Sequence, residues 1–257
     1  MMLARAIVRP PAPNFTEGLT TAGLGPPAYE MAREQHEAYC RTLERCGLEL
    51  TRLEPDSAFP DSTFVEDTAV IAGRGAVLTR PGAPSRRGEV TSIREALSLY
   101  FTHLHEIAPP GTLDGGDVCE AGDTFFIGIS HRTNEEGASQ LTHVLNREGF
   151  RATTIDIRSI QGLLHLKSGL AYLGEKRLLV ADSIAGEQDF RGFETIRVPP
   201  DELYAANCVR LNQHILLAAG FPATVRLLEG EGYSPILLEV SEFRRMDGGL
   251  SCLSLRF

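Results

Sequence analysis

Short apolar runs separated by glycine- and proline-containing turns make up most of the chain. Residues 6–8 form an apolar run closed by two prolines, which predicts a short buried strand. Between residues 27 and 46, apolar side chains recur on one helical face and Gly47 follows as a stop, so a helix is expected there. Residues 48–53 alternate between apolar and polar, as in a half-buried strand. The chain is therefore expected to begin with a strand, a helix and a second strand.

The order strand, strand, helix, strand then recurs. Residues 64–71 and 76–79 are predicted strands joined by a glycine turn, and a helix is expected from about residue 86 to residue 100. The pattern returns about 50 residues later, a spacing typical of repeat architectures. Further hairpins are predicted at 114–128, 169–180 and 207–217, with a helix ending near residue 147, a helix after Pro222 and a strand at 236–240.

Repetition of this kind is typical of radial or stacked units rather than of independent domains. Residues 1–257 are therefore expected to form one α/β domain. Leu253, Leu255 and Phe257 alternate as in a strand, so the C-terminal stretch is expected to open or complete a fifth unit. The residues at the entrances of the hairpins would then converge on a shared centre.

Composition narrows the class of protein. Apolar residues make up 42% of the 257 residues and charged residues 23%, as in ordinary globular proteins. The net charge of −9 argues against nucleic acid or an anionic membrane as a partner. No apolar run reaches the length of a membrane span, and the N-terminus lacks the apolar core of a signal peptide. Five scattered cysteines favour a reducing cytoplasm with free thiols.

Cys252 is the candidate nucleophile. It follows the Gly248-Gly249 turn and precedes the alternating C-terminal run, which would present its thiol on the rim of a packed strand. A thiol in such a place is suited to covalent catalysis if a base and a charged pocket lie nearby.

Acidic residues mark other hairpin entrances. Glu66 and Asp67 follow the apolar pair 64–65 and precede another, which places them within a predicted apolar strand, where an unpaired carboxylate is costly. Asp114 and Asp117 enclose two glycines that would allow a close backbone approach. The alternative interpretation of such acids is a solvated surface.

His165 is the preferred general acid and base. It stands at the entrance of the third hairpin in an apolar frame, whereas a lone histidine between leucines is also typical of a buried structural residue. The sequence around it contains no histidine, cysteine or aspartate at metal-ligand spacing. No metal is expected.

The charged residues suggest a substrate with a cationic and an anionic end. Asp61, Glu66 and Asp67 could surround a guanidinium, and arginine forks suit a carboxylate. Arg86 and Arg132 occupy equivalent places in successive repeats, although helix-start residues on the surface are the alternative. The glycine-rich segment 15–25 is either a surface loop or a mobile lid.

An ordered set of motifs resembles one enzyme family over essentially the whole chain. The motifs lie at 59–67, 79–87, 113–117, 132–134, 164–167, 205–208 and 247–252. They resemble those of the dimethylarginine dimethylaminohydrolase (dimethylargininase) family, guanidine-modifying enzymes of the pentein superfamily. The resemblance implies a five-bladed, pseudo-symmetric α/β-propeller (pentein fold) built from ββαβ repeats. It also implies conversion of Nω-methylated L-arginine to L-citrulline and methylamine or dimethylamine, with no cofactor.

The resemblance also assigns roles to residues. Cys252 looks like the nucleophile, His165 the group that protonates the leaving amine and activates water, and Asp114 the acid that orients His165. The expected substrate-binding residues are Asp61, Glu66 and Asp67 around the guanidinium, Arg86 and Arg132 at the carboxylate, and the backbones of Leu19 and Met246.

Two other functions remain open at this stage. An arginine deiminase or an amidinotransferase would share the Cys-His-acid core, and a non-catalytic binder of cationic amino acids would retain the pocket. The sequence does not fix the oligomeric state, and a homodimer is among the states it allows.

Overall fold

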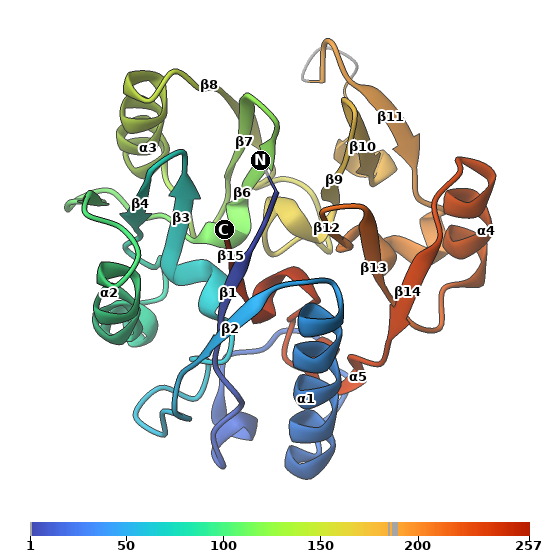
Figure 1. Cartoon of the computed structure of the whole chain (residues 1–257), viewed down its shortest axis with the longest axis horizontal. Helices are drawn as coiled ribbons and strands as arrows, with labels where there is room; N and C mark the ends of the chain where they lie inside the picture. The colour runs from blue at the N-terminus through green and yellow to red at the C-terminus, as the bar shows by residue number, and fades with distance from the viewer. Residues whose placement is uncertain (1, 185, 187–189) are drawn as a thin grey trace.

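The computed structural model describes residues 2–184, 186 and 190–257. These residues form five three-stranded sheets arranged around a common centre (Figure 1). In every sheet the middle strand pairs antiparallel with the inner strand and parallel with the outer one. The sheets, with the middle strand second, are β15-β1-β2, β3-β4-β5, β6-β7-β8, β9-β10-β11 and β12-β13-β14.

The strands and helices follow one another as short elements. The strands are β1 (Arg5–Val8), β2 (Glu49–Arg52), β3 (Ala69–Ala72), β4 (Gly75–Leu78), β5 (Leu104–Glu106), β6 (Val118–Ala121), β7 (Thr124–Ile129), β8 (Arg151–Asp156), β9 (Leu170–Gly174), β10 (Arg177–Val180), β11 (Glu194–Arg197), β12 (Val209–Leu211), β13 (His214–Ala218), β14 (Pro235–Leu238) and β15 (Leu255–Arg256). The α-helices are α1 (Tyr29–Arg45), α2 (Val90–Ser98), α3 (Glu135–Arg147), α4 (Pro222–Gly230) and α5 (Ser241–Arg244).

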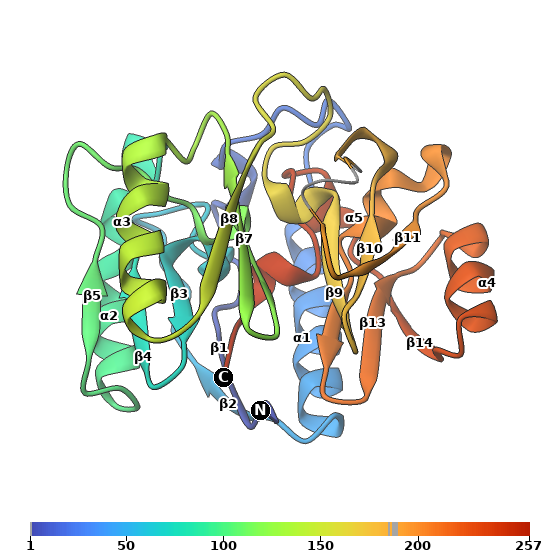
Figure 2. The same ribbon diagram turned by 90° about the horizontal axis from the view of Figure 1, so that it is seen from above.

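Burial explains why the middle strands read as apolar runs rather than as alternating ones. All six residues of β7 are buried, because the strand has a neighbour on each edge and apolar side chains over its faces. Helix α3 supplies one cover, with Ala138, Leu141 and Leu145 in the same apolar cluster as Phe125 and Ile127. The four longer helices lie at the periphery (Figures 1 and 2). The inner strands of the sheets lie toward the centre.

The two ends of the chain share the first sheet. Ile7 in β1 pairs with Leu255 in β15, and Ala6 pairs with Arg256. The tail therefore completes the unit that the N-terminus began, as predicted. Strands β1 and β15 lie near the centre in Figure 1.

The unit of β9, β10 and β11 differs from the predicted strand, strand, helix, strand order. Between β10 and β11, the described residues include the 3-10 turn η6 (Asp182–Ile184) where a helix was expected. Part of this connection, residues 185 and 187–189, lies outside the described residues. The other units keep an α-helix between their middle and outer strands.

The strands predicted at 64–71 and 114–119 begin later than expected. Glu66 and Asp67 lie in the 3-10 turn η2 (Val65–Thr68), and Asp117 lies in η4 (Gly115–Asp117). Cys252 likewise lies in η8 (Ser251–Leu253), ahead of β15 rather than on a strand rim. In a 3-10 turn neighbouring side chains point in different directions. Glu66 and Asp67 can therefore face different spaces.

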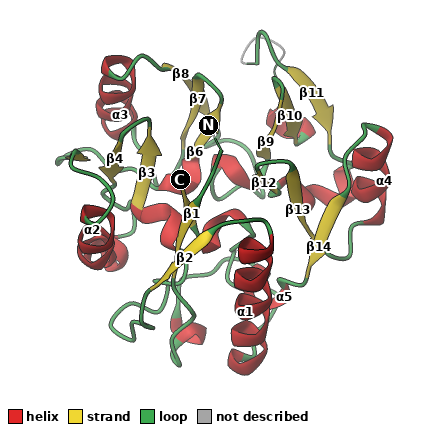
Figure 3. Ribbon diagram, viewed as in Figure 1, coloured by secondary structure: helices red, strands yellow, loops and turns green. Residues whose placement is uncertain are grey.

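Such turns recur at every inner strand. Turn η2 precedes β3, η4 precedes β6, η5 (Leu166–Ser168) precedes β9, η7 (Pro200–Ala206) precedes β12 and η8 precedes β15. Contacts link η8 to η2, η2 to η4, η4 to η5, and η5 to η7. Figure 3 shows these short turns in red near the middle of the molecule. The turns gather the hairpin entrances at one place. None of the described helices is both long and apolar enough to cross a membrane.

Candidate active site

A pocket opens over the turns at the centre of the molecule. It is lined by Leu19, Asp61, Phe64, Asp67, Arg86, Arg132, Leu164, His165, Met246, Asp247, Gly248 and Cys252. All the residues expected at the site line it except Asp114 and Glu66. Asp114 lies directly behind His165, whereas Glu66 faces another space.

His165 is held between carboxylates. Its Nε2 lies 3.0 Å from Oδ2 of Asp114 and 4.0 Å from Oδ1 of Asp67. The other oxygen of Asp114 accepts a hydrogen bond of 2.8 Å from the backbone N–H of Gly82. Asp114 therefore has a fixed orientation and fixes the imidazole in turn.

These carboxylates keep a proton on His165. Burial alone lowers the pKa of the imidazole, but Asp67, Asp117 and Asp114 outweigh burial and raise the pKa to about 9. At neutral pH His165 is therefore an imidazolium inside a buried site, ready to donate a proton rather than to accept one.

Asp117 holds the turn η5, which directly follows His165. It is fully buried, and its Oδ1 accepts the backbone N–H of Leu166 at 2.9 Å. Its Oδ2 accepts the hydroxyls of Ser130 at 2.6 Å and Thr133 at 2.7 Å. Burial raises the pKa of Asp117 to about 6 although these donors oppose the rise.

Glycines allow the turns to approach one another, as predicted for residues 115 and 116. A Cβ on Gly116 would lie 2.7 Å from Oδ1 of Asp67 and 2.8 Å from Nδ1 of His165. A Cβ on Gly115 would lie 2.0 Å from the carbonyl oxygen of Glu66. The backbone N–H of Gly116 donates to Oδ1 of Asp67 at 2.9 Å. A side chain at either glycine would push η4 away from its neighbours.

Cys252 is partly buried and lines this pocket. Its Sγ accepts a hydrogen bond of 3.4 Å from the backbone N–H of Gly249. Burial, with Glu66 and Asp67 nearby, raises the pKa of the thiol to about 12. The thiol is therefore neutral at physiological pH, and a positive charge placed beside it would favour its ionisation.

Asp67 and Arg86 form a buried ion pair at the pocket wall. Nη1 of Arg86 lies 2.6 Å from Oδ2 of Asp67, and its Nε and Nη2 donate to Glu89 at 3.0 and 2.8 Å. Burial alone raises the pKa of Asp67, but His165 and Arg86 outweigh burial and lower the pKa to about 2. Asp67 is therefore an anion at any working pH. Glu89 has no part in the expected site, although its place three residues after Arg86 is a signal for such pairing.

The glycine-rich segment 15–25 contributes Leu19 to the lining of the pocket. The backbone N–H of Leu19 donates to both oxygens of Asp61, at 3.0 and 3.2 Å. Further along, Thr21 donates to the carboxylate of Asp247 from its backbone and its hydroxyl. Asp247, which the sequence did not single out, lies in the left-handed region with a φ of 57°. The loop is thus tied to two acids at the pocket rim.

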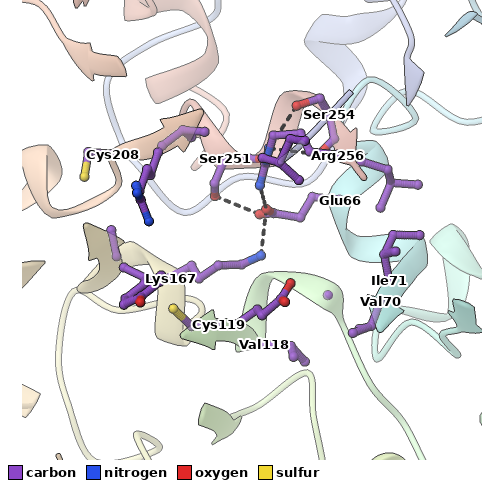
Figure 4. Close-up of a pocket in the computed structure, with 18 of the residues that line it drawn as sticks. Glu66, Val70, Ile71, Val118, Cys119, Lys167, Cys208, Ser251, Ser254 and Arg256 are labelled. Atoms are coloured by element: carbon purple, nitrogen blue, oxygen red, sulfur yellow. Dashed lines mark hydrogen bonds and ion pairs between the residues drawn. The ribbon is translucent and has the colours of Figure 1, made fainter. Parts of the chain in front are cut away.

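Glu66 points away from this pocket. Its Oε1 lies 2.6 Å from Nζ of Lys167 and 3.0 Å from Nη2 of Arg256, and its Oε2 accepts the hydroxyl of Ser251 at 2.7 Å. These residues line a separate central cavity of about 760 Å³ (Figure 4). The structure therefore does not bring the carboxylate of Glu66 together with Asp61 and Asp67.

Three of the site residues also form a group of metal-ligand type. One ligand atom each from Asp67, Asp114 and His165 lies within 4.8 Å of the others. Spacing in the sequence did not reveal this group, because its members come from three different turns. The carboxylate oxygens of Asp67 and Asp114 already accept hydrogen bonds from His165, Arg86 or backbone N–H groups. A protonated imidazole cannot bind a metal ion. The arrangement suits a held proton better than a metal ion.

The chain is similar to known proteins over its full length. It is 43% identical over 257 residues to N(G),N(G)-dimethylarginine dimethylaminohydrolase of Pseudomonas aeruginosa, covering 100% of both chains. The chain belongs to the dimethylarginine dimethylaminohydrolase family. A family model described as arginine deiminase also matches residues 57–218.

Two solved structures match the fold, and the first of them is of the Pseudomonas aeruginosa enzyme. A mutant with serine in place of a cysteine, complexed with citrulline, matches with a TM-score of 0.95 at 42% identity. An adduct of a dimethylarginine dimethylaminohydrolase variant with S-methyl-L-thiocitrulline matches with a TM-score of 0.95 at 43% identity. Each match covers 100% of both chains. The predicted pentein fold and the family resemblance are confirmed.

Proposed function

We propose that this protein hydrolyses Nω-methylated L-arginines to L-citrulline and methylamine or dimethylamine. One observation carries the proposal. A neutral thiol and a protonated imidazole line the same pocket, with an obligate carboxylate, Asp67, beside them. That set can bind a guanidinium, attack its carbon and protonate a departing amine.

The substrate lies with its cationic end toward the acids. Asp67 and Asp61 face the guanidinium, and Arg132 with Arg86 receives the α-carboxylate. Arg86 contributes to carboxylate binding mainly through its positive charge, because its N–H groups already donate hydrogen bonds to Asp67 and Glu89. The backbones of Leu19 and Met246 close the pocket around the amino-acid end.

Catalysis begins with ionisation of the thiol. A guanidinium beside Cys252 lowers the pKa of the thiol, which loses its proton to solvent as the substrate binds. The sulfur attacks the guanidinium carbon, a C–S bond forms and a tetrahedral adduct results. His165 then gives its proton to the methylated nitrogen, the C–N bond breaks and the amine leaves. A thiouronium remains on Cys252.

Water completes the cycle. The neutral imidazole left by the first step takes a proton from water, which attacks the thiouronium carbon. The second proton of the water leaves the new carbonyl oxygen for the sulfur as the C–S bond breaks. L-citrulline leaves, and the neutral thiol is regenerated with His165 protonated again. Asp114 keeps the ring oriented through both steps.

An arginine deiminase of the same superfamily is the second candidate, which the arginine deiminase model matching residues 57–218 favours. Incubating the purified protein in parallel with dimethylarginine, monomethylarginine and arginine, and measuring citrulline, separates the two. Citrulline from the methylated substrates supports the proposal. Citrulline from arginine alone would establish the deiminase. Citrulline from none of the three, with no thiol adduct, would leave a binding protein.

A further inference from the structure

Arg256 lies behind the turn that carries the nucleophile, on the side of the central cavity (Figure 4). Its Nη1 lies 3.0 Å from the carbonyl oxygen of Ser251 and 3.0 Å from that of Ser254. These two carbonyls flank Cys252 and Leu253. The side chain therefore holds both ends of the segment that contains the sulfur.

The same guanidinium reaches a second turn. Its Nη2 donates to Oε1 of Glu66 at 3.0 Å, and Glu66 precedes Asp67 in η2. Ser251 adds a parallel link, because its hydroxyl donates to Oε2 of Glu66 at 2.7 Å. Arg256 and Ser251 thus connect the turn of the nucleophile to the turn of the acid that faces His165.

We infer that Arg256 is a positioning residue that fixes the sulfur of Cys252 relative to Asp67 and His165, with Glu66 as its anchor. The inference rests on the proposed function and explains why Glu66 faces away from the pocket. A planar guanidinium can bond two carbonyls and a carboxylate at fixed angles, which an ammonium cannot do.

Neutralisation of Glu66 does not by itself account for Arg256. Lys167 lies 2.6 Å from the same oxygen of Glu66 and already compensates its charge. If charge were the only requirement, a lysine at position 256 would serve as well as the arginine. The planar fork is what a lysine would lose.

The first test compares Arg256→Lys and Arg256→Met with wild type, using dimethylarginine as substrate. Arg210→Met is the matched control, because Arg210 lines the same cavity but is exposed and lies over the ring of Tyr172. We expect kcat to fall about a hundredfold in both position-256 variants, with KM nearly unchanged, since misplacement of reacting atoms costs this much. The control keeps the wild-type kcat. A wild-type kcat in Arg256→Lys would overturn the inference.

The second test labels Cys252 with two reagents, a cationic chloroacetamidine that uses the pocket and neutral iodoacetamide that does not. Positioning predicts slower labelling by the amidine in both variants and unchanged labelling by iodoacetamide. Faster iodoacetamide labelling with a lower Tm would show general loosening, and equal slowing of both reagents would show lost thiol reactivity; either result overturns the inference. This readout stays valid if wild type fails to turn over dimethylarginine, which would refute only the proposed function.

Discussion

At the scale of single residues, the site depends on which groups hold protons before substrate arrives. The buried carboxylates around His165 raise its pKa to about 9, and burial raises the pKa of Cys252 to about 12. At neutral pH the thiol is therefore neutral and the imidazole is charged. A bound cationic substrate would lower the pKa of the thiol and favour the thiolate. The reactivity of Cys252 is therefore coupled to substrate binding.

Substitution of Asp117 tests directly whether the buried carboxylates raise the pKa of His165. Asp117→Asn keeps the shape of the side chain but removes one of the charges that raise the pKa of His165. We expect the pKa of His165, measured by NMR titration of the ring, to fall below its wild-type value of about 9. Asp123→Asn, at an exposed ion pair with Arg151, is the control. An unchanged His165 pKa in Asp117→Asn would contradict the assignment of charge.

The same pKa shift affects stability. The pKa of His165 is about 9 in the folded state and about 6.5 in an unfolded chain, so the folded state binds this proton more tightly. The stabilisation is complete below pH 6.5 and is lost as pH rises through 9. Denaturant unfolding at pH 6 and pH 9.5 should show a larger loss of unfolding free energy in wild type than in His165→Gln. Equal losses would show that the imidazole is not stabilised as a cation.

At the scale of elements, the ring of 3-10 turns does the positioning. Gly116→Ala would place a Cβ within 2.8 Å of Asp67 and His165 at once, so η4 must move away from both. We expect a loss of kcat of about a hundredfold, the usual effect of displacing reacting groups. Gly230→Ala in helix α4 is the control, because its Cβ meets nothing within 4 Å. Its kcat should be unchanged, and Gly116→Ala with wild-type kcat would contradict the account.

Periodicity predicted the elements well but not the turns between them. Alternation and helical spacing revealed the hairpins, α1, α3 and the C-terminal strand, because those signals span several residues. The 3-10 turns are three to seven residues long and carry apolar flanks, so 64–67 resembled the start of a strand. The direction of Glu66 depends on those turns and could not be derived from spacing. The pairing of Arg86 with Glu89 did have a signal, their spacing of three residues.

At the scale of the whole molecule, the tail joins the first and second units. Leu255 is buried in a cluster that includes Ile7 from β1, Val65 from η2 and Leu78 from β4. Removing its side chain leaves a cavity between two units, so Leu255→Ala should lower the unfolding free energy by about 2–5 kcal/mol. Leu237→Ala, at a residue 48% exposed on β14, should cost much less. Equal small effects in denaturant unfolding would show that the tail is not part of the core.

The central claim is that methylated arginine passes through a covalent thiouronium on Cys252. Its most direct test is rapid acid quenching during turnover of monomethylarginine or dimethylarginine, followed by mass spectrometry of the intact protein. The account predicts one adduct of identical mass from both substrates, because the methylated amine has left before the intermediate accumulates, and no adduct in Cys252→Ser. Adducts that differ in mass between the two substrates, or an adduct of that mass in Cys252→Ser, would contradict it.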